Sequence, residues 1–221
     1  MNMSSFPGSP RLIKGGLVAV DPVSGAAVRV ITLQYNPETL SRTLQIQGAG
    51  SETGDRTEVL RLKGPPVESF KLDAEIDATD QLEFPDQNRQ AVESGIYPQL
   101  AALETLVYPT SAQLQADIGL AQSGTLEIAP LEAPLLLLVW SKSRVVPVRL
   151  TEFSVTEEMF DASLNPIRAK VSLGLRVLSV NDLGAAHRGT SLYLSYQQQK
   201  ERLASANPAG ELSALGIQGL P

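Results

Sequence analysis

Hydrophobic and polar positions alternate strictly between residues 168 and 177. The odd positions are apolar: Ala169, Val171, Leu173, Leu175 and Val177. The even positions are polar or glycine: Arg168, Lys170, Ser172, Gly174 and Arg176. A period of two is that of a β-strand, whose successive side chains point to opposite faces of a sheet. The pattern therefore predicts an antiparallel strand with one buried face and one polar face.

The preceding segment, residues 145–160, alternates in the same way but changes phase once. Its apolar residues lie first at even and then at odd positions: Val146, Val148 and Leu150, followed by Phe153 and Val155. A β-bulge near Thr151-Glu152, which adds one residue to a strand, would return both sets to one face and increase the twist. We therefore predict that 145–160 and 166–180 form one antiparallel hairpin with an irregularity at this point.

A further alternating strand is predicted from Val67 to Asp77. Its inward positions are apolar: Phe70, Leu72, Ala74 and Ile76. Its outward positions include three carboxylates, which we call the acidic stripe: Asp73, Glu75 and Asp77. The cations of the strand at 168–177 form the corresponding basic stripe: Arg168, Lys170 and Arg176. The looped oxygen ligands and the glycine of a calcium-binding loop are missing around the acidic stripe, so the sequence disfavours a metal site.

Shorter patterns predict the remaining regular elements. The apolar runs 17–20 and 27–33 flank a turn that contains proline and glycine, which indicates a hairpin. Two more strands are expected at 40–46 and at the continuous apolar run 133–140. Two helices are expected, at 97–108 and 190–204.

The other segments are predicted to be irregular. The negative charge continues past the acidic stripe into a loop that ends near Asn88, through Asp80, Glu83 and Asp86. Long polar loops are expected at 48–57 and 109–126, and loops of this length are commonly functional or ordered by a partner. The expected organisation is a flexible N-terminal arm, one domain and a flexible C-terminal tail, at residues 1–16, 17–206 and 207–221.

Composition removes several classes of function. The 221 residues include no cysteine, which excludes disulfides, zinc–thiolate sites and thiol catalysis. A net charge of −6 argues against general nucleic-acid binding, which needs cations to neutralise phosphates. The N-terminus has no secretory signal pattern, and the longest apolar run is shorter than a membrane span. We expect a cytoplasmic protein without direct membrane insertion.

Candidate catalytic residues are few. His187, the one histidine, lies in a glycine-flanked segment that is expected to be an exposed loop. No nucleophile elbow, metalloprotease motif or dinucleotide fingerprint occurs in the sequence. The carboxylates leave a two-carboxylate hydrolase open, but none lies in a pattern that indicates a substrate cleft. The sequence therefore favours a protein that is not an enzyme and that binds no cofactor.

Two segments together resemble the tube proteins of contractile injection systems, which are phage-tail-like particles. The first contains the strand break Tyr35-Asn36-Pro37-Glu38. The second begins with an apolar strand that ends at Trp140 and continues through Thr151-Glu152-Phe153-Ser154-Val155 to Phe160-Asp161 and Pro166-Ile167-Arg168-Ala169-Lys170-Val171. The last of these elements is the most specific, and the resemblance covers roughly residues 17–180.

The resemblance implies a mainly β fold, an antiparallel sandwich or barrel of the tail-tube type with one or two accompanying α-helices. It implies a hexameric ring that joins the inner tube to the baseplate spike hub, with the inner tube protein and the hub protein as partners. Many members of this family carry a lysin-motif domain, and this chain is expected to lack it. Alternatives are a repeating inner-tube protein, a tube cap, or an unrelated β-sandwich enzyme or carbohydrate binder.

The two charged stripes are the candidate assembly interface. Complementary charges fix the register of a contact more than its affinity, so the acidic and basic stripes could align neighbouring protomers or layers. The alternative is that both stripes are ordinary solvated faces. The expected location is an assembled particle in the cytoplasm, with later release from the cell left open.

Overall fold

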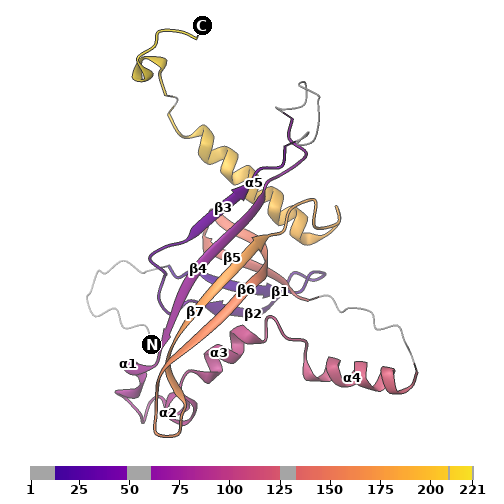
Figure 1. Cartoon of the computed structure of the whole chain (residues 1–221), viewed down its shortest axis with the longest axis vertical. Coiled ribbons are helices and arrows are strands. Elements are labelled where there is room, and N and C mark those ends of the chain that lie inside the picture. Colours follow the sequence, from indigo (N-terminus) through magenta and orange to yellow (C-terminus); the bar gives the residue numbers. More distant parts are fainter. Residues whose placement is uncertain (1–12, 49–60, 125–132, 209, 221) are drawn as a thin grey trace.

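The computed structural model describes residues 13–48, 61–124, 133–208 and 210–220. Seven antiparallel strands form one sheet in the order β2-β1-β5-β6-β7-β4-β3 (Figure 1). Their bounds are β1 Gly16–Val20, β2 Ala27–Thr32, β3 Ser41–Gln45, β4 Val67–Asp77, β5 Leu135–Ser141, β6 Arg144–Phe160 and β7 Pro166–Val177. The prediction of a mainly β, antiparallel fold is confirmed.

The β6–β7 hairpin has the predicted pairing and the predicted irregularity. Its register shifts between Leu150 and Glu152, so Thr151 is the extra residue of a bulge. Leu150 and Phe153, on either side of the bulge, both pack against the core. The phase change in the sequence thus marks the point where the strand bends while keeping its apolar side chains on one face.

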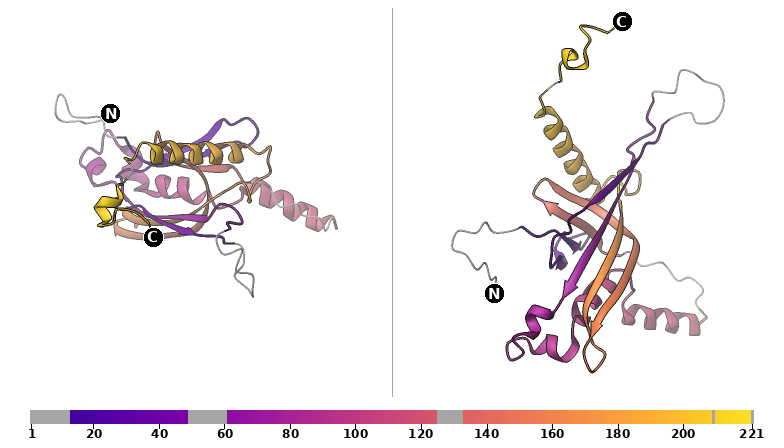
Figure 2. Two further views of the ribbon diagram at one scale, coloured as in Figure 1. Left: turned by 90° about the horizontal axis from the view of Figure 1, so that it is seen from above. Right: turned by 60° about the vertical axis from the view of Figure 1, so that its left-hand side comes forward.

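The buried faces of the strands meet in one core. The inward residues of β7 from Ala169 to Leu175 are completely buried, and Phe70 and Leu72 of β4 are almost so. The same cluster includes residues of β1, β5 and β6 and of three helices. Figure 2 shows that the sheet twists strongly along its length, which lets one sheet enclose a single core.

The sheet does not close into a barrel within the described residues, because β2 and β3 remain its two edges. Near the end of β2, a side chain partly bridges the gap to β4. The Gln34 side-chain amide donates to the Asp77 carbonyl at 2.6 Å, and its oxygen accepts the Asp77 N–H at 2.9 Å. This pair of hydrogen bonds resembles the pairing of two strands, so it holds the N-terminal hairpin against the end of β4.

The chain has more helix than the expected one or two. The α-helices are α1 Thr79–Leu82, α2 Arg89–Ser94, α3 Tyr97–Glu104, α4 Ser111–Gln122 and α5 Arg188–Ser205. Helices α3 and α5 correspond to the two predicted ones. The predictions of a loop around Asp80 and of a loop at 109–126 are wrong, because these segments contain α1 and α4; α2 was not predicted. A capping box between Thr110 and Gln113 stabilises the start of α4, which satisfies backbone donors that a loop would leave to water.

Two predicted segments lie mostly or partly outside the described residues: the glycine-rich loop at 48–57 and the N-terminal arm. The last described segment contains a short 3₁₀ helix, η1 Leu212–Leu215. The division into arm, domain and tail stays a prediction. Among the residues with described positions, no helix is long and apolar enough to cross a membrane.

The bulge leaves no room for a side chain at Gly174, which lies opposite it on β7. A Cβ atom added to Gly174 would lie 2.8 Å from Cβ of Glu152, which is closer than two such atoms can pack. We predict that Gly174→Ala destabilises the protein by about 1–3 kcal/mol, the usual cost of overpacking. Urea denaturation measures it, with Gly184→Ala as the matched control, because a Cβ atom added there meets no other atom within 4 Å. An unchanged unfolding midpoint for Gly174→Ala would show that the bulge tolerates a side chain there.

Candidate assembly interface

One face of the sheet is polar over β3, β4, β7 and much of β6. The outward positions of β3, β4, β7 and β6 carry hydroxyl, amide and charged side chains, among them Thr43, Lys71, Asp73, Ser154, Thr156, Lys170 and Ser172. The opposite face of β4 and β7 is buried in the core. The polar face is therefore suited to contact water or another polar surface, and it carries both predicted stripes.

The structure places the acidic and basic stripes side by side, because β4 pairs with β7. Asp77 lies opposite Arg168, and Glu75 lies opposite Lys170. Arg168 Nε donates to Asp77 at 2.7 Å and lies 3.4 Å from Glu75. The charges of the two stripes thus neutralise each other within a single chain at the end that contains Asp77 and Arg168. The alternation within each strand did not reveal that the two stripes are neighbours.

The other cations of the basic stripe also have partners in the same chain. Lys170 Nζ lies 3.0 Å from Glu158 of β6, and Arg176 lies 2.6 Å from Asp182 beyond β7. Ser172 donates to Asp73 across the β4–β7 pair. Each of the six stripe residues therefore has a partner within the chain, and the two stripes are not separate charged patches. Their role in assembly stays a prediction.

Asp77 is the most enclosed carboxylate of the acidic stripe, with a side chain only 11% exposed. It accepts a hydrogen bond from the Thr79 N–H at 2.7 Å and pairs with Arg168. Burial alone would raise the pKa of Asp77, but the hydrogen bonds from Thr79 and the charge of Arg168 outweigh it and lower the pKa. Asp77 therefore joins β4 to α1 and β7, whereas Asp73 is exposed to solvent.

A buried carboxylate that the sequence reasoning missed fastens α5 to the sheet. Glu68, only 3% exposed, lies on the inward face of β4, in phase with Phe70 and Leu72. It accepts hydrogen bonds from the Tyr196 hydroxyl and from Lys200 Nζ, each at 2.8 Å. Glu68 lies at an even position of the strand, as the buried residues Phe70 and Leu72 do, and this shared spacing was the signal that could have revealed its burial. A buried carboxylate needs such partners, because an unpaired one is costly.

The partners of Glu68 also interact with each other. Lys200 Nζ lies 4.0 Å from the centre of the Tyr196 ring, a distance typical of a cation–π contact. Burial raises the pKa of the Tyr196 phenol, and the hydrogen bond to Glu68 raises it further. The phenol therefore stays protonated at neutral pH and acts as a hydrogen-bond donor. The network positions the first half of α5 against the core.

His187 lies in the connecting segment before α5, as expected, but it is not exposed. It is half-buried and is the N-cap of α5, where its Nδ1 accepts the Gly189 N–H at 3.0 Å. This contact gives the histidine a structural role at the start of the helix. Within residues 13–48, 61–124, 133–208 and 210–220, no group of three metal-ligating side chains comes together.

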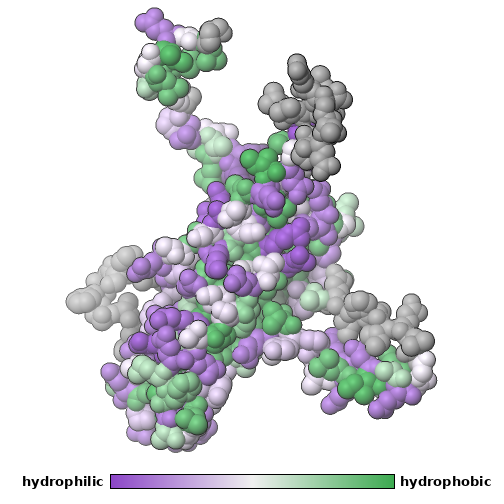
Figure 3. Space-filling view, in the orientation of Figure 1, coloured by the Kyte–Doolittle hydropathy of each residue, from purple (hydrophilic) through white to green (hydrophobic). Residues whose placement is uncertain are grey.

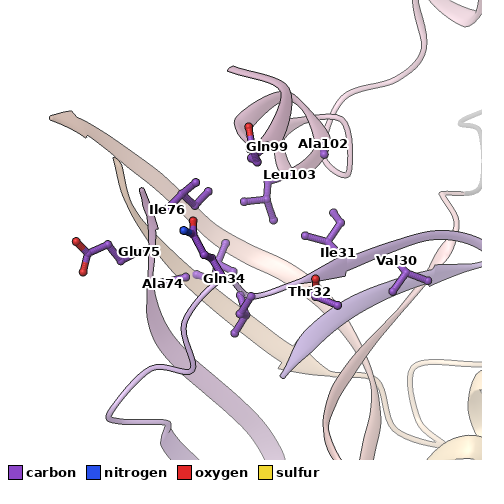
Figure 4. A pocket seen from close by; sticks show the side chains of 12 residues that line it. Val30, Ile31, Thr32, Gln34, Ala74, Glu75, Ile76, Gln99, Ala102 and Leu103 are labelled. Atoms are coloured by element: carbon purple, nitrogen blue, oxygen red, sulfur yellow. The ribbon is translucent and has the colours of Figure 1, made fainter. Parts of the chain in front are cut away.

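An apolar cavity of about 230 Å³ lies at the gap between β2 and β4, beneath α3. In Figure 4, Ile31, Ile76 and Leu103 point into it, and Glu75 points away. The polar residues that line it are Thr32, Gln34, Gln99 and Glu75, and the Glu75 carboxylate is directed away from the centre. The cavity is therefore a consequence of incomplete sheet closure and carries no recognisable chemistry.

Comparison with known proteins identifies the family. Residues 19–183 match the family model described as contractile injection system tube protein. Because the match spans most of the chain, the protein belongs to this family, whose members are structural proteins of phage-tail-like particles. Membership argues against an unrelated β-sandwich enzyme or carbohydrate binder. A search of curated proteins found no match.

Two solved structures were also found. One is a chain from the tail of an empty gene transfer agent particle with C6 symmetry, at 10% identity and a TM-score of 0.29. The other is from the virion of a native gene transfer agent particle, at 10% identity and a TM-score of 0.28. Each comparison covers 74% of this chain and 90% of the other chain.

The hydrogen bonds of Glu68 predict that the packing of α5 against the sheet depends on this one carboxylate. Glu68→Ala would leave Tyr196 and Lys200 without their acceptor, so we expect a loss of about 1–3 kcal/mol in the free energy of unfolding. Hydrogen exchange should also become faster in α5 than in β7. Glu201→Ala, an exposed carboxylate on the same helix, is the matched control. Equal exchange of α5 in both variants would contradict this role.

The lowered pKa of Asp77 predicts acid sensitivity. A carboxylate whose pKa is lower in the folded state stabilises the protein above its ordinary pKa of about 3.9, and this contribution is lost as the pH falls through the lowered value. Asp77→Asn should cost about 1–2 kcal/mol at pH 7 and should reduce the loss of stability below about pH 4. Urea denaturation from neutral to acidic pH measures both effects. Identical pH profiles for the two proteins would contradict the assignment.

Proposed function

We propose that this chain forms a sixfold ring that joins the inner tube of a contractile injection particle to the spike hub of its baseplate. The observation that carries the proposal is the single sheet with two unpaired edges, in which β4, β7 and much of β6 turn one face to the core and a polar face outward. The family membership supplies the context of a tube. The proposed partners are other copies of the chain, the inner tube protein and the hub protein, within a particle assembled in the cytoplasm.

The edges support assembly into a closed ring. In the described residues β2 pairs only with β1, and β3 pairs only with β4 among the strands. Val28 and Val30 of β2 are each more than half exposed. An unpaired edge with exposed apolar residues promotes aggregation unless another chain covers it. In a closed ring, the β2 edge of one copy would lie against the β3 edge of the next copy, so both edges of every copy would be covered.

The polar face supports a position facing an aqueous channel. The network of Asp73, Glu75, Arg168 and Lys170 satisfies much of its charge within one chain, so the face does not need a partner to be stable in water. A ring built with this face inward would enclose a hydrated lumen. The apolar face would remain in the core of each copy.

Elements outside the sheet support the junction with the hub. Helix α4 has no buried residue, and Leu114 and Ile118 are about half exposed. The C-terminal segment also exposes apolar residues, including Leu215 and Leu220. Figure 3 shows hydrophobic residues on both elements, away from the main body. Such projections fit contacts with neighbours of more than one kind, as a junction requires. A repeating inner-tube protein is the second candidate.

Size-exclusion chromatography with light scattering of the purified chain tests the position in the particle. A junction ring is templated by its hub, so the isolated chain should form only small, reversible assemblies. Negative-stain microscopy of the same sample provides an independent reading. Long stacked tubes from the isolated chain would favour the repeating-tube candidate instead.

Charge reversal tests whether the acidic stripe faces the lumen or another molecule. Asp73→Lys with Glu75→Lys leaves Asp77 intact but places new cations beside Arg168 and Lys170, so we expect a loss of about 1 kcal/mol in the free energy of unfolding, the order of a surface ion pair. The matched control is Asp73→Asn with Glu75→Gln. Particle yield of the two variants should be alike, because a stripe that faces water has no partner to repel. A lower particle yield from the reversed variant than from the control would mean instead that the stripe contacts another molecule.

A further inference from the structure

Part of the core-facing side of β3 is left uncovered. Leu44 lies opposite Glu68 in the β3–β4 pair, so the two side chains lie on the same inward face of the sheet. Glu68 is buried beneath α5, whereas Leu44 is 45% exposed. Ile46, two residues further along the chain, is 75% exposed. The cover that α5 gives to the inward face therefore ends beside Glu68.

The buried face of α5 also continues beyond the sheet. Tyr193 and Tyr196 are buried against the core. Leu203 follows Tyr196 by seven residues, which is two helical turns, so it lies on the same face of the helix. It is nevertheless 56% exposed, and Figure 1 shows α5 continuing past the strands toward the C-terminal segment. We call Leu44, Ile46 and Leu203 the uncovered strip.

The C-terminal segment, residues 210–220, carries apolar side chains of its own. Leu212 and Leu215 lie three residues apart in η1, so they share one side of this short 3₁₀ helix. Leu215 is 75% exposed, and Ile217 is also exposed. The Ile217 N–H donates to the Leu212 carbonyl, which closes the turn after η1. The segment is thus a short preformed element whose apolar side has no cover in the extended arrangement of Figure 1.

The connection to α5 is suited to a reversal of the chain. Four residues lie between Ser205, the last residue of α5, and Gly210. Antiparallel helices are commonly joined by two to five residues, and Pro208 prevents the helix from continuing. A reversal at this point would bring the C-terminal segment back along α5.

The spacing of the apolar residues agrees with such a reversal. Leu203 and Lys200 are separated by about 4.5 Å along α5, and Leu212 and Leu215 by about 6 Å along η1. If Leu212 lies against Leu203, Leu215 therefore comes level with Lys200. Lys200 donates to Glu68, which lies opposite Leu44. Leu215 would then reach the uncovered side chain of Leu44.

The charges favour the same orientation. Glu211 is the charged residue of the segment 210–220. In the reversed arrangement it lies level with the last turn of α5, which carries the exposed Arg202. Arg42, whose side chain is 41% exposed, flanks the strip from β3. Exposed ion pairs add little affinity, but they help to set the orientation of a contact.

We propose that residues 210–220 are a strap that folds back along α5 and covers the uncovered strip of the same chain. The short connection holds the strap at an effective concentration of about millimolar, so a weak apolar contact is enough to close it. Closure shields the strip in the free chain, where exposed apolar surface otherwise promotes association with other molecules. The proposal does not depend on the ring, because every contact lies within one copy.

Binding of the apolar dye ANS distinguishes a closed strap from a projecting segment. A chain shortened to end at Ala206 should bind about twofold more dye than the full chain, because the strip loses its cover. Leu212→Ser with Leu215→Ser should have the same effect, and Ser213→Ala with Gln218→Ala is the matched control. Equal or lower dye binding by the shortened chain would overturn the proposal, since a projecting segment only adds apolar surface. A cooperative thermal transition confirms that each variant folds.

Introduced thiols report the closed arrangement directly, since the chain has no cysteine. Leu44→Cys with Leu215→Cys should form a disulfide within one chain about tenfold faster than Val28→Cys with Leu215→Cys. Val28 is the matched control because it is exposed on β2, at the opposite edge of the sheet. Equal rates for the two pairs would overturn the closed strap. Disulfides that join two chains would show that the segment reaches another copy, which would also overturn closure within one chain.

Discussion

The burial of one face of β7 is the constraint on which the rest of the structure depends. Ala169, Val171, Leu173 and Leu175 are completely excluded from solvent, while the alternate positions carry charge or hydroxyl groups. A shift of one residue in the register of this strand would exchange the two faces. The neighbours β6 and β4 must therefore pair with β7 in one register, and that register places Asp77 beside Arg168 and Lys170 beside Glu158. The bulge at Thr151 lets the long strand β6 keep its apolar side chains on the same side as it bends.

This arrangement produces the features that make the chain suitable for a tube. A sheet that turns one face to its own core leaves its other face to water and its edges to neighbours. The incomplete closure at Gln34 keeps β2 and β3 as edges, and Glu68 holds α5 across one end of the core. In the proposed function, the contacts of the chain depend on the surfaces that the fold leaves uncovered.

The sequence predicted those elements whose side chains obey one periodicity. The hairpin of β6 and β7, its bulge and the burial of β4 all follow from alternation and its one change of phase. The pairing of the two stripes could not be predicted, because alternation within a strand does not reveal which residue of the next strand lies opposite. Glu68 was missed although it shares the parity of Phe70, since a carboxylate was assumed to face solvent. Helix α4 was missed because its apolar residues, such as Leu114, Ile118 and Leu120, do not gather on one helical face, and its start is fixed by a capping box between Thr110 and Gln113.

The most direct test of the central claim is cryo-electron microscopy of the native particle at a resolution that traces individual strands. The account predicts one sixfold ring of this chain between the inner tube and the spike hub, with Asp73, Ser154 and Lys170 facing the lumen and edges β2 and β3 covered by neighbouring copies. A chain that occurs as a monomer in the particle, or whose polar face of β4, β7 and β6 points away from the channel, would contradict it.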